Sequence, residues 1–355
     1  MSTVQPGVVT PINSAGQWGP QTSVPTPTTP YSGTFIPTVW SGKLARKFYA
    51  NTIFGAIANS DWYGEISNMG DKVIINTIPD ITVKPYKVGM QLEYEVPQGE
   101  TFELVVDEGC YYAVNVNDVM EYQAKPQLMN MFTTDAAQQM KLAVDARGIA
   151  KTFFTAEGKL KTDEKGYKAV WTKNVGANAG ARTGAYNLGT DAAPVALTPD
   201  NILNYITQLS TVLDEADIPE DGRYLVITPY ERQILMMSNL AQAQFMGDAK
   251  SVLRNGLIGK IDRFEIYVNN LLPRAAEGKT WDTKAENFTP GTDGEAKKRH
   301  LIWAGQKSGI SFASQITKTE NLRNPNDFGS LVRGLNIWGT QVVQGQCLAP
   351  MIVAN

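Results

Sequence analysis

A long helical segment constrains the fold of this chain more than any other feature of the sequence. The segment runs from Pro126 to about Ala156 and carries an approximate apolar stripe, formed by Met129, Phe132, Ala136, Met140, Ala143 and Ala150. About 30 residues at ~1.5 Å per residue span ~45 Å, which is long for a helix of a globular domain. We therefore expect a backbone element around which other parts pack. Gly148 is a position where the helix could end or bend.

The N-terminal segment has a different character. Residues 1–42 contain no charged side chain and are interrupted repeatedly by proline, so we expect an extended arm instead of a core element. Its aromatic residues suit anchors on another surface, and they are Trp18, Tyr31, Phe35 and Trp40. A disordered leader is the alternative. The segment lacks the regions of a secretory signal, and the chain has no apolar run of ~18 residues, so we expect no membrane partner.

The sequence that follows the N-terminal arm predicts a protruding extension. A short helix is expected within Ile36–Ile57, followed by strands near Val73–Thr77 and Phe102–Val106. The segment between these strands is polar, contains several Pro and Gly residues, and is too long for a tight hairpin turn. We predict a long two-stranded ribbon with little apolar material. A ribbon of this kind is marginal alone, so we expect it to rest on a neighbouring molecule.

The remaining elements predict a mixed α+β protein. We expect a strand at Tyr111–Val119, a surface insertion at 158–195, and a polar loop at 274–299. An α/β lobe should contain a helix beginning near Thr198, a strand at Tyr224–Thr228, a helix beginning at the capping box Thr228–Glu231, and a strand at Phe264–Val268. The final run, Leu301–Pro350, alternates and predicts several strands that return the chain to a β-rich lobe.

Sequence motifs for catalysis or cofactor binding are missing. The chain contains one histidine, His300, and two distant cysteines, Cys110 and Cys347, which we expect to be structural. The adjacent acids Asp107 and Glu108 are more typical of salt bridges than of acid–base catalysis. The glycine-rich segment 255–264 has the wrong spacing for a phosphate-binding loop. We therefore assign no catalytic, cofactor or metal residue, and predict that the protein is not an enzyme.

The charge balance is also informative. Lys and Arg total 32 against 35 Asp and Glu, which gives a net charge of −3. A protein that grips nucleic acid through phosphates usually has a basic surplus. Contact with DNA should therefore be weak, local or passive.

The order of these elements resembles the HK97-like fold of tailed-bacteriophage major capsid proteins. Four segments of the sequence also resemble members of this family. They are FIPTVWSGKLARKFYANTIFGAIANSDWYGEISNMGDKVIINTIPDITVKPY, DVMEYQAKPQLMNMFTTDAAQQMKLAVDARG, LRNGLIGKIDRFEIYVNNLLP and FGSLVRGLNIWGTQVVQGQCL. The resemblance covers roughly residues 34–350. It implies an extended N-arm (1–42), an N-terminal helix region of the P-domain (43–72), an E-loop β-hairpin with its base strands (73–110), a P-domain with a long spine helix (111–157), the insertion (158–195), most of the A-domain (196–300) and a return to P-domain and A-domain strands (301–355).

The resemblance also implies a function and partners. Identical subunits would form pentamers and hexamers of an icosahedral shell that confines phage double-stranded DNA, in a virion assembled in the host cytoplasm. Implied partners are a portal protein, possibly a decoration protein, and a separate scaffolding protein, because the arm is too short and too Pro-rich for a helical scaffold. Contacts between subunits would come from the four aromatic residues of the arm and from charged residues of the extension, namely Lys84, Lys87, Glu93, Glu95, Glu100 and Glu103.

Two other interpretations remain open at this point. An encapsulin, a cellular compartment of the same fold, would enclose cargo enzymes instead of DNA. An α/β enzyme with a β-rich accessory domain would form a discrete particle of a few subunits. DNA content and particle size separate these interpretations from a phage shell.

Overall fold

The computed structural model describes residues 52–61, 72–76, 81–91, 93–97, 99, 101–118, 128–238, 260–275, 299–324 and 328–354. All of these belong to one compact unit, Lys47–Asn355. The predicted arm with Trp18, Tyr31, Phe35 and Trp40 lies outside the described residues, as does Glu100. The same holds for most of the helix expected within 36–57 and most of the loop 274–299.

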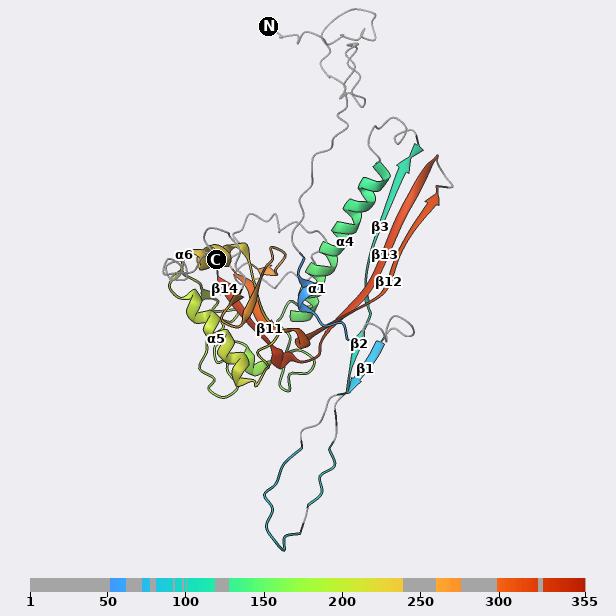
Figure 1. Ribbon diagram of the computed structural model, residues 1–355. Coiled ribbons are helices and arrows are strands. Elements are labelled where there is room, and N and C mark those ends of the chain that lie inside the picture. Colours follow the sequence, from blue (N-terminus) through green and yellow to red (C-terminus); the bar gives the residue numbers. More distant parts are fainter. Residues whose placement is uncertain are drawn as a thin grey trace, which may run out of the picture. The chain divides into compact units, whose positions relative to one another are not determined.

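One half of this unit is a three-stranded antiparallel sheet with a long helix beside it. The sheet has the order β12-β13-β3, formed by Ile310–Arg323, Gly329–Val342 and Glu108–Asn117. Helix α4, Leu128–Phe153, lies along β3 and β13 (Figure 1). Its 26 residues span about 39 Å, which confirms the long helix predicted from the sequence.

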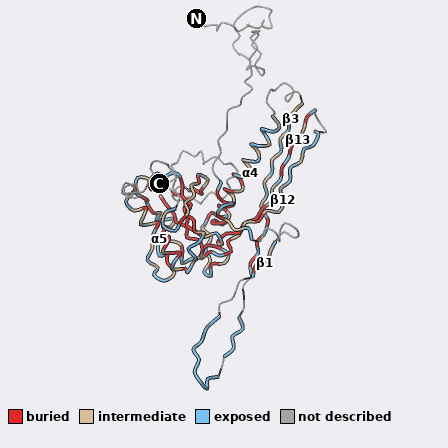
Figure 2. The backbone as a smooth tube through the Cα atoms, in the orientation of Figure 1, coloured by how far each residue is buried: buried red, intermediate tan, exposed pale blue. Residues whose placement is uncertain are grey.

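Only the C-terminal part of α4 is well buried. Ala143 and Ala150 are buried as predicted, but Phe132 is 43% exposed and Met140 is half-buried. Within the described residues, the predicted apolar stripe is thus buried only along the C-terminal half of the helix, where most of the covering residues lie (Figure 2). Gly148 does not end the helix. A Cβ at Gly148 would lie 3.2 Å from the ring of Phe54, so glycine allows the close packing of that ring.

The other half is a seven-stranded mixed sheet flanked by two helices. Its strand order is β6-β14-β11-β7-β9-β8, with β10 paired to β11. The strands are β6 Val195–Ala196, β7 Arg223–Ile227, β8 Lys260–Ile261, β9 Phe264–Val268, β10 Arg274–Ala275, β11 Arg299–Gln306 and β14 Leu348–Ala354. Every residue of β7 is buried, as expected for a strand in the interior of a covered sheet. The strands predicted around Tyr224 and Phe264 are confirmed.

Both helices of this half follow their sequence signals. Helix α5, Ile202–Glu215, is the helix predicted near Thr198, and it buries one apolar face that includes Ile206, Leu209 and Leu213. It begins at Ile202, later than predicted, after a turn in which the carbonyl of Thr198 accepts the N–H groups of Asn201 and Ile202. Helix α6, Pro229–Met237, begins at the predicted capping box of Thr228 and Glu231.

The final strands divide between the two sheets. β11 and β14 are paired in the seven-stranded sheet, whereas β12 and β13 belong to the three-stranded sheet. The run 301–350 is thus β-rich as predicted, but it does not form a single lobe. The rings of Phe153, at the end of α4, and Trp303, in β11, lie 4.8 Å apart, so the two halves share a core.

The segment 158–195 is part of this core. Val170, Ala179 and Leu188 are fully buried, and the Asn174 side chain donates to the carbonyl of Gln346 at 2.7 Å. Its regular elements are short: β4 Thr162–Asp163, β5 Val170–Trp171, β6, and the 3-10 turn Thr172–Asn174. The prediction of a surface insertion was wrong, because the buried residues are scattered between short elements and leave no periodic stripe in the sequence. Two further 3-10 turns, Lys307–Gly309 and Gly345–Cys347, join the final strands.

Candidate subunit interface

The predicted extension is anchored by a small antiparallel pair of strands. β1, Lys72–Asn76, pairs with β2, Thr101–Val105, so that Lys72 is opposite Val105 and Asn76 is opposite Thr101. Phe102 and Leu104 are buried in a small cluster with Ala313 and Val343. This burial fixes the base of the extension to the three-stranded sheet, because Ala313 lies in β12 and Val343 directly follows β13. The two strands predicted from alternation are therefore confirmed.

Beyond its base, the extension is not the predicted two-stranded ribbon. Residues 81–91 and 93–97 contain no strand. Pro85 and Pro97 have no N–H group to donate to a ladder, which opposes strand pairing there. At the tip, Met90 N–H donates to the carbonyl of Lys87 at 3.1 Å in a turn where Gly89 has a φ of +84°.

The extension has two limbs, which are the chain segments on either side of the turn at its tip. The limbs are joined by interactions of their side chains and not by a ladder of backbone hydrogen bonds. Lys84 Nζ lies 2.7 Å from Glu93 Oε2, and the N–H of Thr82 donates to Glu95 at 3.2 Å. At the base, Lys72 pairs with Glu103 at 3.0 Å. Three of the acids predicted to contact a neighbour therefore already have partners within their own chain. Exposed pairs of this kind contribute only ~0–1 kcal/mol each, so they hold the limbs in register more than they stabilise the fold.

The residues between these polar positions are apolar and strongly exposed. Ile81 is 67% exposed, Val83 93%, Tyr94 90% and Val96 82%. We call these four residues the apolar set of the extension; Tyr86, Val88 and Met90 at the tip are also exposed. Figure 2 shows the described part of the extension exposed along its length. The expectation of little apolar material was wrong, and the alternation of Ile81 and Val83 with Thr82 and Lys84 is the signal that reveals it.

Exposed apolar residues gathered on one projecting segment are unusual for a subunit that stays alone. Contiguous apolar surface on a soluble protein typically marks a site of protein–protein contact. Lys87 lies in the turn at the tip and is exposed as well. The extension therefore combines polar and charged side chains that pair across it with apolar side chains that are exposed.

Charged residues near the end of α4 hold the base of the three-stranded sheet. Lys151 pairs with Asp107 and lies 3.7 Å from Glu108, so the adjacent acids are salt-bridge partners as predicted. Lys161 Nζ donates to the carbonyl of Lys151 at 2.6 Å and thereby binds the C-terminal end of the helix. Burial and the neighbouring charge of Lys151 lower the pKa of Lys161.

The single histidine has a buried acidic partner. His300 Nε2 lies 2.5 Å from Glu231 Oε1, and both side chains are almost fully buried. Glu231 also accepts the N–H of Thr228 at 2.9 Å as part of the capping box. Burial raises the pKa of Glu231, but the hydrogen bond and charge of His300 outweigh this effect, so the pKa lies below its usual range. The pair thus joins β11 to the start of α6.

The described residues offer little for catalysis or metal binding. They contain no group of three or more His, Cys, Asp or Glu side chains able to hold a metal ion. Cys110 is half-buried and Cys347 is buried, both are free thiols, and burial raises the pKa of each. Such thiols are poor nucleophiles. None of the described helices is both long and apolar enough to cross a membrane.

Comparison with solved structures finds several proteins whose fold is similar to that of this chain. The structure from Mycobacterium phage Che8 matches with a TM-score of 0.65 and 21% identity over 90% of this chain and 97% of that chain. The capsid of the cyanophage P-SCSP1u matches with a TM-score of 0.64 and 16% identity, covering 90% and 94% of the two chains. This chain has a phage capsid fold. The mature capsid of bacteriophage PhiM1 agrees, with a TM-score of 0.61 and 14% identity over 89% and 90% of the two chains. No protein-family model and no curated protein sequence matches the chain.

Proposed function

We propose that this protein is the major capsid protein of a tailed bacteriophage, and that it acts by self-assembly and not by catalysis. The observation that carries this proposal is the likeness to capsid subunits over nearly the whole length of both chains. A shared fold alone leaves function open. The projecting extension, with its exposed apolar side chains, favours assembly over chemistry.

The regions of the HK97-like fold are assigned as follows in this proposal. Helix α4 is the spine helix of the P-domain, and the sheet β12-β13-β3 is its strand layer. The pair β1–β2 with the segment between them is the E-loop. Residues 1–42 form the N-arm, 43–72 the N-terminal part of the P-domain, and 196–300 most of the A-domain. The segment 158–195 belongs to the shared core instead of being an appendage.

The extension and the arm form the contacts between subunits in this proposal. Closed symmetry requires one surface of the subunit to fit a complementary surface of its neighbour many times. The apolar set of the extension supplies burial, at roughly 25 cal/mol per Å² of apolar surface, while Lys84, Glu93 and Glu95 keep the limbs in register. Lys87, Glu100, Glu103 and the aromatic residues of the arm are further proposed contacts.

The proposed partners follow from the same role. Copies of the chain assemble into pentamers and hexamers of an icosahedral shell in the host cytoplasm, with a separate scaffolding protein, a portal protein and possibly a decoration protein. DNA is confined in the virion without sequence-specific binding. A net charge of −3 suits a wall along which packaged DNA must move, because a strongly basic wall would hold the phosphates.

Electron microscopy of the full chain, alone and with the scaffolding protein of its phage, tests the proposal. We expect closed shells or shell fragments. A stable monomer or dimer under all conditions would contradict the proposal.

A surface variant tests the contact surface. Tyr94→Ser should leave thermal melting of the subunit unchanged, because the side chain is 90% exposed, but should lower shell yield. Tyr230→Ser changes an exposed tyrosine of α6 and is the matched control, with shell yield expected at the level of the unmodified chain. Equal shell yield for the two variants would remove the extension from the proposed interface.

A further inference from the structure

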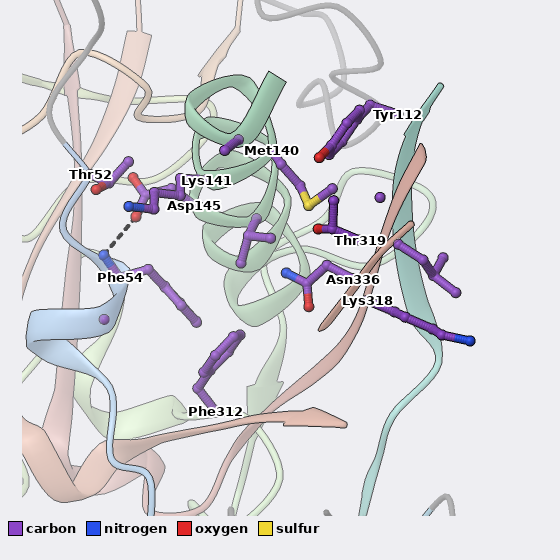
Figure 3. A pocket seen from close by; sticks show the side chains of 15 residues that line it. Thr52, Phe54, Tyr112, Met140, Lys141, Asp145, Phe312, Lys318, Thr319 and Asn336 are labelled. Atoms are coloured by element: carbon purple, nitrogen blue, oxygen red, sulfur yellow. Dashed lines mark hydrogen bonds between the residues drawn. The ribbon is translucent and has the colours of Figure 1, made fainter. Parts of the chain in front are cut away.

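A pocket of about 380 Å³ lies between α4, the short helix α1 (Phe54–Ile57) and the three-stranded sheet (Figure 3). This volume falls in the range of about 300–1,000 Å³ that is typical of pockets that bind another group. Most of the walls are apolar, and they are formed by Phe54, Tyr112, Ala137, Met140, Val144, Phe312 and Leu335. The pocket can therefore hold a bulky apolar side chain from outside the described residues.

The pocket leaves part of the apolar side of α4 without cover from the described residues. Ala137 is exposed and Met140 is half-buried, and both line the pocket. On another wall, the rings of Phe54 and Phe312 lie 5.6 Å apart and pack edge to face. Figure 3 shows Met140, Phe54 and Phe312 around the same space. An aromatic side chain in this space would contact two rings and a thioether, and both kinds of contact are favourable for it.

The described chain begins in the wall of this pocket. Thr52 is the first described residue and lines the pocket, as does Gly55. Residues 47–51 belong to the same compact unit but lie outside the described residues. Phe48 precedes Thr52 by four positions, so the Cα atoms of the two residues can be at most ~14 Å apart. The chain itself therefore holds the ring of Phe48 within reach of the pocket.

The spacing from Thr52 favours Phe48 over the residues beside it. In an extended chain, side chains an even number of positions apart share a face, and in a helix those three or four positions apart do so. Phe48 meets both conditions relative to Thr52, and it also precedes Gly55 by seven positions, which is two helical turns. Tyr49 meets only the helical condition and Ala50 only the extended one. Phe48 is thus on the side of the pocket in either conformation.

The wall at the start of α1 is held in place by a buried carboxylate. Asp145 of α4 is 2% exposed and also lines the pocket. Its Oδ1 accepts the N–H groups of Ile53 at 3.0 Å and Phe54 at 2.6 Å, and its Oδ2 accepts a side-chain N–H of Asn269 at 2.7 Å. A ring that enters the pocket therefore meets a wall that is already ordered, which lowers the entropic cost of docking.

We propose that the side chain of Phe48 of the same chain occupies this pocket and covers Ala137 and Met140 of α4. This inference does not depend on the proposed function. A buried aromatic side chain removes about 150–250 Å² of its own surface from water, and the pocket walls lose exposed apolar surface as well. Because Phe48 is tethered four residues from Thr52, its effective concentration at the pocket exceeds that of a second copy in dilute solution. The docked ring holds residues 48–51 on the long helix.

A double-variant cycle in the full chain, followed by thermal melting, tests the proposal. Phe48→Ala should lower the melting temperature by about 4 °C or more, because it empties the pocket. Ala137→Leu adds apolar volume to the pocket wall, so with Phe48 in place it should lower the melting temperature by about 2 °C or more. In the Phe48→Ala chain the added leucine fills vacated space, so Ala137→Leu should there raise the melting temperature.

Two matched variants serve as controls. Ala136→Leu makes the same change at the next residue of α4, which lines a different groove with Cys110 and Arg147. Its effect on the melting temperature should be the same with and without Phe48→Ala. Tyr49→Ala removes the neighbouring ring and should leave the effect of Ala137→Leu unchanged. If Phe48→Ala does not fold, Phe48→Leu replaces it in the cycle, with the same reversal of sign expected.

Three results would overturn the proposal. One is an effect of Ala137→Leu that is equal with and without the substitution at Phe48. Another is coupling of Ala137→Leu to Tyr49→Ala as strong as its coupling to Phe48→Ala, which would mean that the pocket does not select Phe48. The third is coupling that disappears when the protein is diluted to monomers, because the occupant would then come from a second copy.

Discussion

Replacement of Gly345 by alanine tests whether the segment 158–195 belongs to the core. A Cβ at Gly345 would lie 1.7 Å from the carbonyl oxygen of Ala169 and 2.7 Å from its carbonyl carbon. Real Cβ atoms essentially never approach closer than 3.0 Å, so the two backbones must separate by at least about 1.3 Å. Both sides of this contact are backbone, which cannot rotate away as a side chain can.

The cost has two parts. Overpacking of a well-packed interior typically costs about 1–3 kcal/mol. The separation also strains the hydrogen bond from Gly345 N–H to the carbonyl of Gly166, which measures 2.6 Å and contributes about 1 kcal/mol. We therefore expect Gly345→Ala to lower the free energy of unfolding by roughly 2–4 kcal/mol.

Denaturant unfolding of the full chain measures this change, with Gly109→Ala as the control. The atom nearest to a Cβ at Gly109 is the carbonyl oxygen of Asn336 at 3.9 Å, so the control should change stability by less than about 1 kcal/mol. Hydrogen exchange should also become faster at 166–171 in Gly345→Ala. If the two glycine variants have the same stability, the segment is a loosely attached insertion and the reasoning fails.

Three further predictions concern other parts of the subunit. Phe54→Ala should lower the free energy of unfolding by about 3–5 kcal/mol, since the ring is buried and packs edge-to-face on Phe312 at 5.6 Å; a loss below about 1 kcal/mol in denaturant unfolding would contradict the packing. Glu231→Gln should lower the melting temperature most near neutral pH. The pKa of Glu231 lies below its usual range, so the stability it provides is present above the unfolded pKa of about 4.3 and is lost as pH falls through the folded value; a difference in melting temperature that stays constant down to acid pH would refute this. Glu93→Lys with Glu95→Lys should slow assembly, measured by light scattering, more at low salt than at high salt, because charge repulsion is screened over ~10 Å at 0.1 M salt; adding Lys84→Glu should recover part of the rate, and an effect independent of salt would point to a packing defect.

Part of the proposed contact surface was predictable from sequence and part was not. The position of the extension, between two strands that begin near Val73 and Phe102, follows from alternation and turn residues. The partners of its charged residues do not follow from the sequence. Lys84 pairs with Glu93 and Lys72 pairs with Glu103 within the same subunit. Such pairings depend on which residue of one limb lies opposite which residue of the other. Because the prolines prevent a regular ladder, they also remove the register that a sequence pattern could provide.

The sequence by itself determined the elements whose signals are local. Helix α4 follows from a long helical pattern, α6 from the capping box at Thr228, β7 from a short apolar run after the Asp221-Gly222 turn, and β9 from the alternation of Phe264, Ile266 and Val268. These signals are local because caps, turns and periodic faces involve residues within a few positions of one another. The order of the elements, together with four sequence segments that resemble those of tailed-phage capsid proteins, indicated the capsid fold.

Only the tertiary structure decided how distant segments meet. It divided the final strands between two sheets, placed Val170 and Leu188 in the core, and left Phe132 exposed at the less covered end of α4. It also brought Ile53, Asn269 and Asp145 together, although they are far apart in the chain. The physical reason is that a buried polar group must find its partners in space, and no periodicity along the sequence records which partners those are.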